Sequence, residues 1–288
     1  MKINGYEIKP GADLEGADLE GADLRYADLR YANLKGADLS YVNLKGAKLK
    51  GAKLGFANLE DANLRYAILK GANLYGAKLW GAKLEFANLE GANLENAKLK
   101  DADLRCSNLH DARLKGAKLH SAKLWGADLR SANLEGANLR YAILKGANLE
   151  GANLEGAKLE GAKLGFANLK GANLEGADLM NADLWHANLR HANLYGAKLG
   201  GANVEATILD VKSEMTHPII PKVAYIHLEY TVSVDDYLKR FVKREKIPTQ
   251  KDYDDWCRSQ AEDYFSIMLS GDEIHLKEDN EIHLKEDN

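Results

Sequence analysis

The chain has 288 residues, a formal net charge of −4 at pH 7, and only four prolines and five phenylalanines. This length suits one long domain or two of ordinary size, and the small net charge gives no general attraction to nucleic acid or to an anionic membrane. No apolar run resembles a signal peptide or approaches the ~18 residues of a membrane span, and Cys106 and Cys257 are too few and too distant for a disulfide framework, so we expect a cytoplasmic protein.

Residues 1–10 precede the regular part of the sequence and are predicted to form an N-terminal capping segment. They contain the apolar residues Ile3, Tyr6 and Ile8 around an Asn-Gly turn signal, and Pro10 follows. A short, turn-containing segment of this kind can cover the first layer of a repeat structure and protect its open edge.

Residues 11–210 consist of forty uninterrupted five-residue units. Leucine stands at every fifth position from Leu14 to Leu199, and alanine stands two residues before nearly every leucine. The residue between them is mostly Asp, Asn or Lys, and the residue two after the leucine is most often glycine. The unit therefore reads A-(D/N/K)-L-X-G.

A period of five residues excludes straight elements. Five residues advance a side chain by about 140° on an α-helix, and successive leucines would alternate faces on a straight strand. Both arrangements expose about half of the apolar set. The chain must therefore turn once per unit, with the frequent glycine at the corner and every Ala and Leu facing a common interior.

The run GADLEGADLEGADLRYADLRYANL resembles the pentapeptide-repeat family, and the resemblance covers residues 11–210. It implies an all-β solenoid: a right-handed quadrilateral β-helix with four units per coil and about ten coils. Some members of this family are similar to a DNA duplex in size and charge and bind DNA gyrase.

Residues 211–271 differ in composition and are predicted to form a mainly α-helical C-terminal cap or dimerisation segment. Residues 223–232 favour a strand, and two helices follow on either side of Pro248. The second helix has an apolar stripe that must be buried, either on the last coil or in a homodimer through residues 233–269. Residues 272–288 form an acidic tail in which EIHLKEDN occurs twice.

No sequence motif for catalysis accompanies the repeats. The chain contains no G-x-S-x-G, Walker loop, H-E-x-x-H or paired C-x-x-C. His186 and His191 are close in sequence but lack an evident third metal ligand. We therefore expect no enzyme activity, no cofactor, no metal site and no small-molecule substrate.

The position after each leucine points outward, and a few large residues there interrupt the charged pattern. Exposed aromatic clusters commonly mark contact sites. The candidate protein-contact residues are Tyr75, Trp80, Trp125, Met180, Trp185, Arg190 and Tyr195. Tyr75 and Trp80 are the better candidates for an external partner, because a folded-back C-terminal segment is able to cover the residues near the last coil.

Three functions remain open. The first is a non-enzymatic scaffold that presents a rigid, mixed-charge surface to an unidentified protein partner. The second is a DNA mimic that binds gyrase or another topoisomerase, which the balance of acidic and basic residues in the repeats disfavours. The third is a structural rod that dimerises through its C-terminal helices.

Overall fold

A computed structural model describes residues 1–208 of the chain. The predicted C-terminal cap, the predicted dimerisation segment 233–269 and the duplicated tail lie outside the described residues. Within residues 1–208 there is no helix with the length and apolarity that a membrane span requires.

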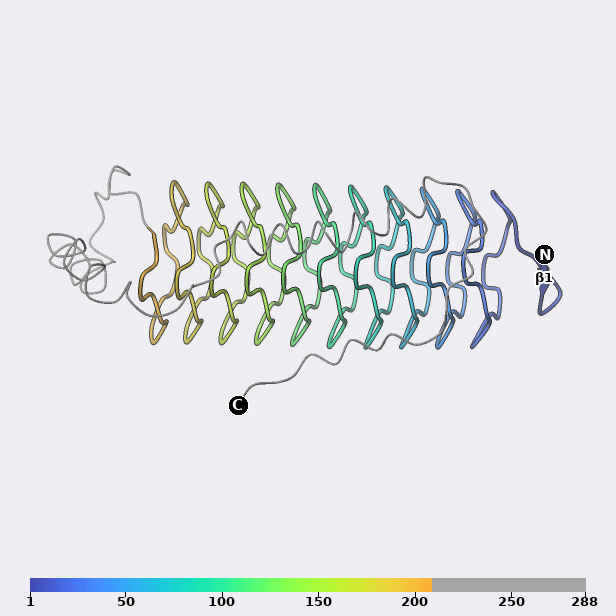
Figure 1. Ribbon diagram of the computed structural model, residues 1–288, viewed down its shortest axis with the longest axis horizontal. Coiled ribbons are helices and arrows are strands. Elements are labelled where there is room, and N and C mark those ends of the chain that lie inside the picture. Colours follow the sequence, from blue (N-terminus) through green and yellow to red (C-terminus); the bar gives the residue numbers. More distant parts are fainter. Residues whose placement is uncertain (209–288) are drawn as a thin grey trace, which may run out of the picture.

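The chain begins with a small antiparallel hairpin at one end of the rod (Figure 1). Strand β1 (Lys2–Ile3) pairs with β2 (Tyr6–Glu7), and Asn4 at the turn has a positive φ of 49°. Ile8 is buried at the edge of the core, and the backbone N–H of Asp18 donates to the Tyr6 hydroxyl at 3.4 Å. The hairpin therefore packs on the first coil.

The rest of the described chain is a stack of four-sided coils, which lie side by side along the rod in Figure 1. Parallel bridges join each middle residue of a unit to the residue twenty positions later, from the pair Asp13 and Asn33 to the pair Asn188 and Ile208. This spacing confirms four units per coil. We number the coils from residues 11–30 onward; at the ~4.8 Å spacing of neighbouring strands, ten coils extend roughly 48 Å.

Each unit ends in a tight turn. In the first unit the N–H of Ala17 donates to the carbonyl of Leu14 at 3.1 Å, and Gly16 has a φ of 66°. The corner residue has a positive φ in every unit from residue 11 to residue 206, while the residue before it does not. This is the pattern of a type II turn, which explains why glycine is frequent at the corner.

Nearly every inward leucine and alanine is fully buried and belongs to one continuous core. Because the corners turn the chain by one face per unit, all four faces contribute to this core. Burial of each leucine contributes roughly 1.5–3 kcal/mol relative to exposure. In the middle coils the inward positions are thus filled by packed side chains, and the variable side chains of residues 11–208 lie on the outer surface.

The preference for Asp and Asn at the middle position of each unit has a structural reason. The side-chain oxygen of this residue accepts the N–H of the residue two positions later, as Asp38 does from Ser40 at 3.0 Å and Asn73 from Tyr75 at 3.0 Å. This Asx turn satisfies a backbone donor that the ladder between coils leaves unpaired. A lysine at the middle position cannot accept this bond, so its presence there costs the turn one hydrogen bond.

Candidate interaction surface

The bridges define four faces of the rod. Face 1 carries middle positions 13, 33 and so on to 193; face 2 carries 18 to 198; face 3 carries 23 to 203; and face 4 carries 28 to 208. Each outward residue follows its middle residue by two positions and belongs to the same face.

The predicted contact residues differ in exposure. Tyr75 and Tyr195 are exposed, at 37% and 59%, and Arg190 is also exposed. Trp80, Trp125, Met180 and Trp185 are half-buried. The outward position therefore displays less of a large side chain than its direction suggests.

The predicted residues near the end of the rod do not form one patch. Tyr195 follows face 1, Met180 follows face 2, Trp185 follows face 3 and Arg190 follows face 4. Although they lie on the ninth and tenth coils, they point away from one another around the rod. Trp185 instead contacts Phe166, with ring centroids 4.8 Å apart, on its own side of the rod.

Tyr75 belongs to an exposed aromatic pair on the corner between faces 1 and 2. Phe56, at the corner of the third coil, is 58% exposed and meets the Tyr75 ring edge-on with centroids 5.4 Å apart. The Phe56 ring also lies over Gly76, where an added Cβ would approach it to 2.8 Å. The glycine therefore makes room for the ring, and the ring remains open to solvent.

Large residues at corner positions are the main surface feature that the sequence analysis did not identify. Tyr26, Tyr31, Tyr41, Phe56 and Tyr141 are all exposed corner residues with positive φ. A signal for them exists in the sequence. A ring at one corner covers the corner twenty residues later, and glycine accommodates it there: a Cβ on Gly51 or Gly161 would lie 2.6 Å from the ring of Tyr31 or Tyr141.

Trp80 lies on face 2 of the same coil as Tyr75. The ammonium of Lys98, from the next coil, is 5.2 Å from the centroid of the Trp80 ring, a cation–π contact. Two open hollows border this part of the rod. One, of about 480 Å³, begins at Tyr75 and continues over the glycines of the following coils; the other, of about 590 Å³, has Trp80 and Gly81 in its lining.

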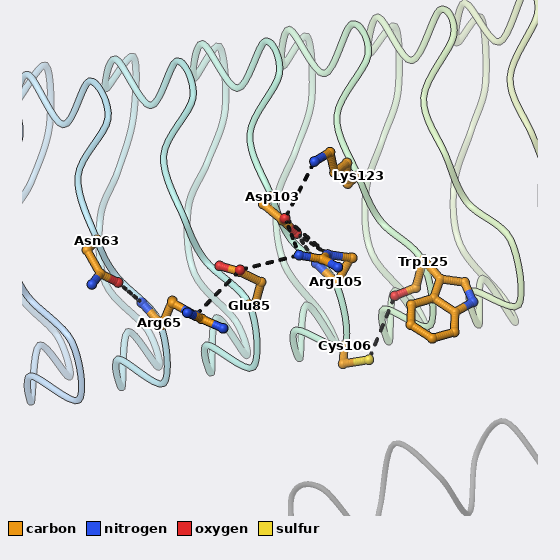
Figure 2. A network of polar contacts seen from close by, with 8 residues as sticks. All are labelled: Asn63, Arg65, Glu85, Asp103, Arg105, Cys106, Lys123 and Trp125. Carbon is orange, nitrogen blue, oxygen red and sulfur yellow. Dashed lines mark hydrogen bonds and ion pairs between the residues drawn. The ribbon is translucent and has the colours of Figure 1, made fainter. Parts of the chain in front are cut away.

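Face 3 carries a ladder of charged side chains, shown in Figure 2. Glu85 is 6% exposed, and its Oε1 lies 3.5 Å from Arg65 Nε and 3.5 Å from Arg105 Nη2. Arg105 also binds Asp103, whose Oδ2 accepts from Nη2 at 2.7 Å, and Lys123 lies 3.9 Å from the same oxygen. Opposite charges on successive coils thus hold this face together.

The environment of the ladder shifts the pKa values of side chains in and beside it, and Trp125 lies at its end. The Asp103 carboxylate raises the pKa of Arg105 above its ordinary value, chiefly by accepting its hydrogen bonds. Burial raises the pKa of the neighbouring Tyr66 hydroxyl. Cys106 Sγ lies 3.9 Å from the Trp125 carbonyl at the end of this network (Figure 2). Trp125 therefore adjoins a structural network on a face different from that of Tyr75.

The two neighbouring histidines His186 and His191 lie at successive corners of the rod. His186 stacks on Phe166, with centroids 5.2 Å apart. In the described part of the chain, no group of three or more His, Cys, Asp or Glu side chains is arranged to hold a metal ion.

Comparison with a protein-family model matches the chain to pentapeptide repeats. The matched segments are 11–40, 43–81, 82–120, 117–156, 147–185, 157–196 and 173–210. They cover well over half of the chain. Among curated proteins, no relative matches the sequence.

Several solved structures are similar to this chain. HetL, a pentapeptide repeat protein involved in heterocyst differentiation regulation in the cyanobacterium Nostoc sp. strain PCC 7120, is 36% identical over 68% of this chain and 92% of its own, with a TM-score of 0.37. QnrB1, a plasmid-mediated fluoroquinolone resistance protein, is 24% identical over 59% of this chain and 91% of its own, with a TM-score of 0.51. The QnrB1 similarity shows the fold, a right-handed quadrilateral β-helix.

Proposed function

The chain belongs to the pentapeptide-repeat family, and from this premise we propose that it is a non-enzymatic scaffold that binds a protein partner at the corner between faces 1 and 2 of coils three and four. We define this surface, the corner surface, by Phe56 and Tyr75 at that corner and by Trp80, which lies across face 2 beside the next corner. The family match supports a repeat scaffold for protein interaction; the location of the contact is our proposal.

The main observation that supports the proposal is the exposed aromatic pair of Phe56 and Tyr75. Aromatic side chains provide much of the binding energy at protein interfaces, because they bury a large apolar area at a small cost in conformational entropy. Phe56 lies on a backbone of positive φ, where a phenylalanine is strained, and its ring is nevertheless 58% exposed. Other corners also carry exposed tyrosines, but Phe56 contacts a second exposed ring, Tyr75, so this corner presents a larger aromatic area to a partner.

The outer surface of the described coils also favours binding over catalysis. Catalysis needs different groups that converge in a pocket shielded from water. The hollows at Tyr75 and Trp80 are wide and open, and their charged lining is partly paired, as Lys115 is with Glu135 at 2.8 Å. We therefore propose that the protein acts without a cofactor. Its location in the cytoplasm stays a separate prediction from the sequence.

Affinity capture from the source organism tests the proposal. The wild-type chain should retain a protein partner that the Tyr75→Ala/Trp80→Ala variant loses. A Tyr31→Ala/Tyr141→Ala variant removes two exposed aromatic rings from other corners and is the matched control. Circular dichroism of each variant verifies that the rod is folded. Equal capture by all three proteins would show that the corner surface is not the contact.

A DNA mimic that binds gyrase is the alternative function, but paired charges in the described coils do not support it. Asp23 and Asp28 of the first coil are paired with Arg25 and Arg30 at 2.7 and 2.6 Å. A DNA-like strip needs unpaired carboxylates along its length, about one charge per 1.7 Å. We expect no effect of the protein on gyrase supercoiling at micromolar concentration; inhibition or protection would favour the mimic.

Dimerisation remains a separate prediction, because residues 233–269 lie outside the described residues. Sedimentation equilibrium of the full chain at several concentrations distinguishes a monomer from a dimer. A monomer would assign the predicted helices to capping alone, and the corner surface would then act as a single site per molecule.

A further inference from the structure

The middle position of face 2 carries lysine on three successive coils. Lys78, Lys98 and Lys118 are joined in series by the parallel bridges, and all three are exposed. We call these three residues the lysine row. Elsewhere in residues 13–208, no face has lysine at the middle position of even two successive coils.

The lysine row is unfavourable for the fold in two ways. Like charges directly opposite each other on paired strands repel. In addition, a lysine cannot accept the N–H of the residue two positions later, so the described residues give Trp80, Lys100 and His120 no Asx-turn bond of the kind that Asn73 gives Tyr75. The same two defects occur on three coils in succession.

The three lysines of the row form no ion pair with the described residues. Several cations at outward positions are paired with carboxylates one coil away, as Lys70 is with Glu90 at 2.9 Å and Lys170 with Glu150 at 3.1 Å. Apart from Lys123, the other middle-position lysines among residues 1–208 also have no such pair, so the row differs from them in its succession on three coils. None of the three lysines has a carboxylate oxygen within 4.0 Å among residues 1–208. A local departure from the rules that stabilise the rest of a fold is expected where the residues serve a function.

The charged side chains around the lysine row indicate which kind of ligand the row can bind. Lys100 and Arg140 add positive charge on the same face, and Lys100 lies 3.7 Å from Asp101 while Arg140 is paired with Glu160 at 3.1 Å. Glu60 lies on face 2 itself, one coil before Trp80, and Asp61 and Asp101 lie at the corner that follows this face; all three line the Trp80 hollow. The lysine row is therefore basic, and the residues beside it are of mixed charge.

We propose that the lysine row binds an acidic, extended segment of the protein partner that contacts the corner surface. This inference rests on the proposed function and specifies the chemistry of the partner. Adjacent coils are ~4.8 Å apart, so the row extends about 10 Å along the rod. In an extended segment, alternate side chains are about 6.7 Å apart on one side, so two acidic residues fit three lysines. Trp80 at the edge of the row provides an aromatic contact.

A fluorescein-labelled dodecapeptide of alternating glutamate and serine serves as the probe. Fluorescence anisotropy with the full chain at low ionic strength should show binding that weakens steeply as salt is added, because exposed charges are screened. Replacement of the row by Lys78→Asn/Lys98→Asn/Lys118→Asn should weaken binding by roughly tenfold or more. The same substitution restores an Asx acceptor on each coil and should raise the melting temperature.

The control variant is Lys48→Asn/Lys53→Asn/Lys163→Asn. These lysines are also exposed and at middle positions, but they lie on faces 4, 1 and 3. The variant has the same change in net charge and the same restored turn bonds, so it should gain stability and retain peptide binding. Equal loss in the two variants would overturn the inference, because general charge rather than the row would then bind the peptide.

Two further outcomes would also overturn it. Absence of peptide binding at millimolar concentration would exclude an acidic segment, and tighter binding of a labelled oligo-dT 12-mer would assign the row to nucleic acid. The proposed function is tested separately by capture with Tyr75→Ala/Trp80→Ala. A partner that is lost from this variant but retained by the row variant would preserve the proposed function and refute the acidic segment.

Discussion

At the scale of single residues, the corner position determines which side chains reach the surface. Its positive φ directs the side chain outward, over the corner of the next coil. Phe56 over Gly76 and Tyr31 over Gly51 show the same arrangement on different edges of the rod. At these corners the exposed ring occupies space that a Cβ twenty positions later would enter.

Substitution of alanine for Gly76 tests this arrangement. Gly71 has the same φ of 64° but no atom within 4 Å of an added Cβ, so Gly71→Ala is the control. Gly71→Ala should lower the free energy of unfolding by about 1–2 kcal/mol through backbone strain alone. Gly76→Ala should cost about 0.5–1.5 kcal/mol more, because the Phe56 ring must move and loses its contact with Tyr75. Urea unfolding measures both; equal costs would contradict the account.

The carboxylates of the first two coils predict a dependence of stability on pH. The pKa values of Asp23, Asp28 and Asp38 lie below the ordinary value, mainly through side-chain hydrogen bonds from Arg25, Arg30 and Ser40 respectively. A lowered pKa in the folded state means that stabilisation is fully present above the unfolded value of about 3.9 and is lost as the pH falls through the folded value.

The unfolding free energy should therefore fall between pH 5 and pH 2 by more in the wild type than in an Asp23→Asn/Asp28→Asn/Asp38→Asn variant. Asparagine retains the turn acceptor but does not titrate in this range. The effect should be modest, since all three groups lie near the surface. Parallel pH curves for the two proteins would show that these carboxylates do not stabilise the fold.

At the scale of elements, the faces differ in how successive coils are joined by side chains. Face 4 has an amide ladder in which Asn168 donates to Asn148 at 3.1 Å and accepts from Asn188 at 3.2 Å. Face 3 uses the ionic ladder around Glu85, and face 2 has the lysine row without such bonds among its lysines. The part of face 2 to which we assign binding of the acidic segment is thus one where successive middle side chains of the described coils form no hydrogen bond or ion pair with one another.

A comparison of Asn168→Leu with Asn108→Leu distinguishes the contribution of the amide ladder to stability from that of the Asx turn. Both asparagines accept the N–H two positions later, at 3.2 Å from Lys170 and 3.0 Å from His110, but only Asn168 belongs to the amide ladder. Asn168→Leu should lower the unfolding free energy by about 1–2 kcal/mol more than Asn108→Leu, because it removes three further hydrogen bonds, with Asn148, Glu150 and Asn188. Equal losses in urea unfolding would show that the ladder contributes nothing.

The architecture of the coil was predictable from the sequence, while much of the surface was not. The five-residue period requires one turn per unit whatever the outward residues are, so Leu14 and its equivalents determine the interior. The exposure of Trp80 or Trp125 depends instead on the side chain one coil away, twenty residues distant in sequence. Phe56 was not predicted to be a contact residue, because the position of its exposed ring depends on Gly76, which is twenty residues later in the sequence.

At the scale of the whole molecule, the residues that stabilise the rod are different from the residues that we expect to bind a partner. The core of leucine and alanine is continuous through the coils, and each coil contacts only its neighbours. Outward residues can therefore change with little effect on the fold. A duplication in the sequence illustrates this: GAKLGFANL at 51–59 and 161–169 places Phe56 on the corner after face 1 and Phe166 on the corner after face 3.

The central claim is that a protein partner contacts the corner surface, and site-specific photo-crosslinking tests it most directly. A benzophenone side chain at position 75, activated in a lysate of the source organism, should give a discrete crosslinked product that the same probe at Tyr31 does not give. Tyr31 is 60% exposed and lies on another corner, so exposure alone cannot produce the difference. The same product from both positions, or none from position 75, would contradict the account.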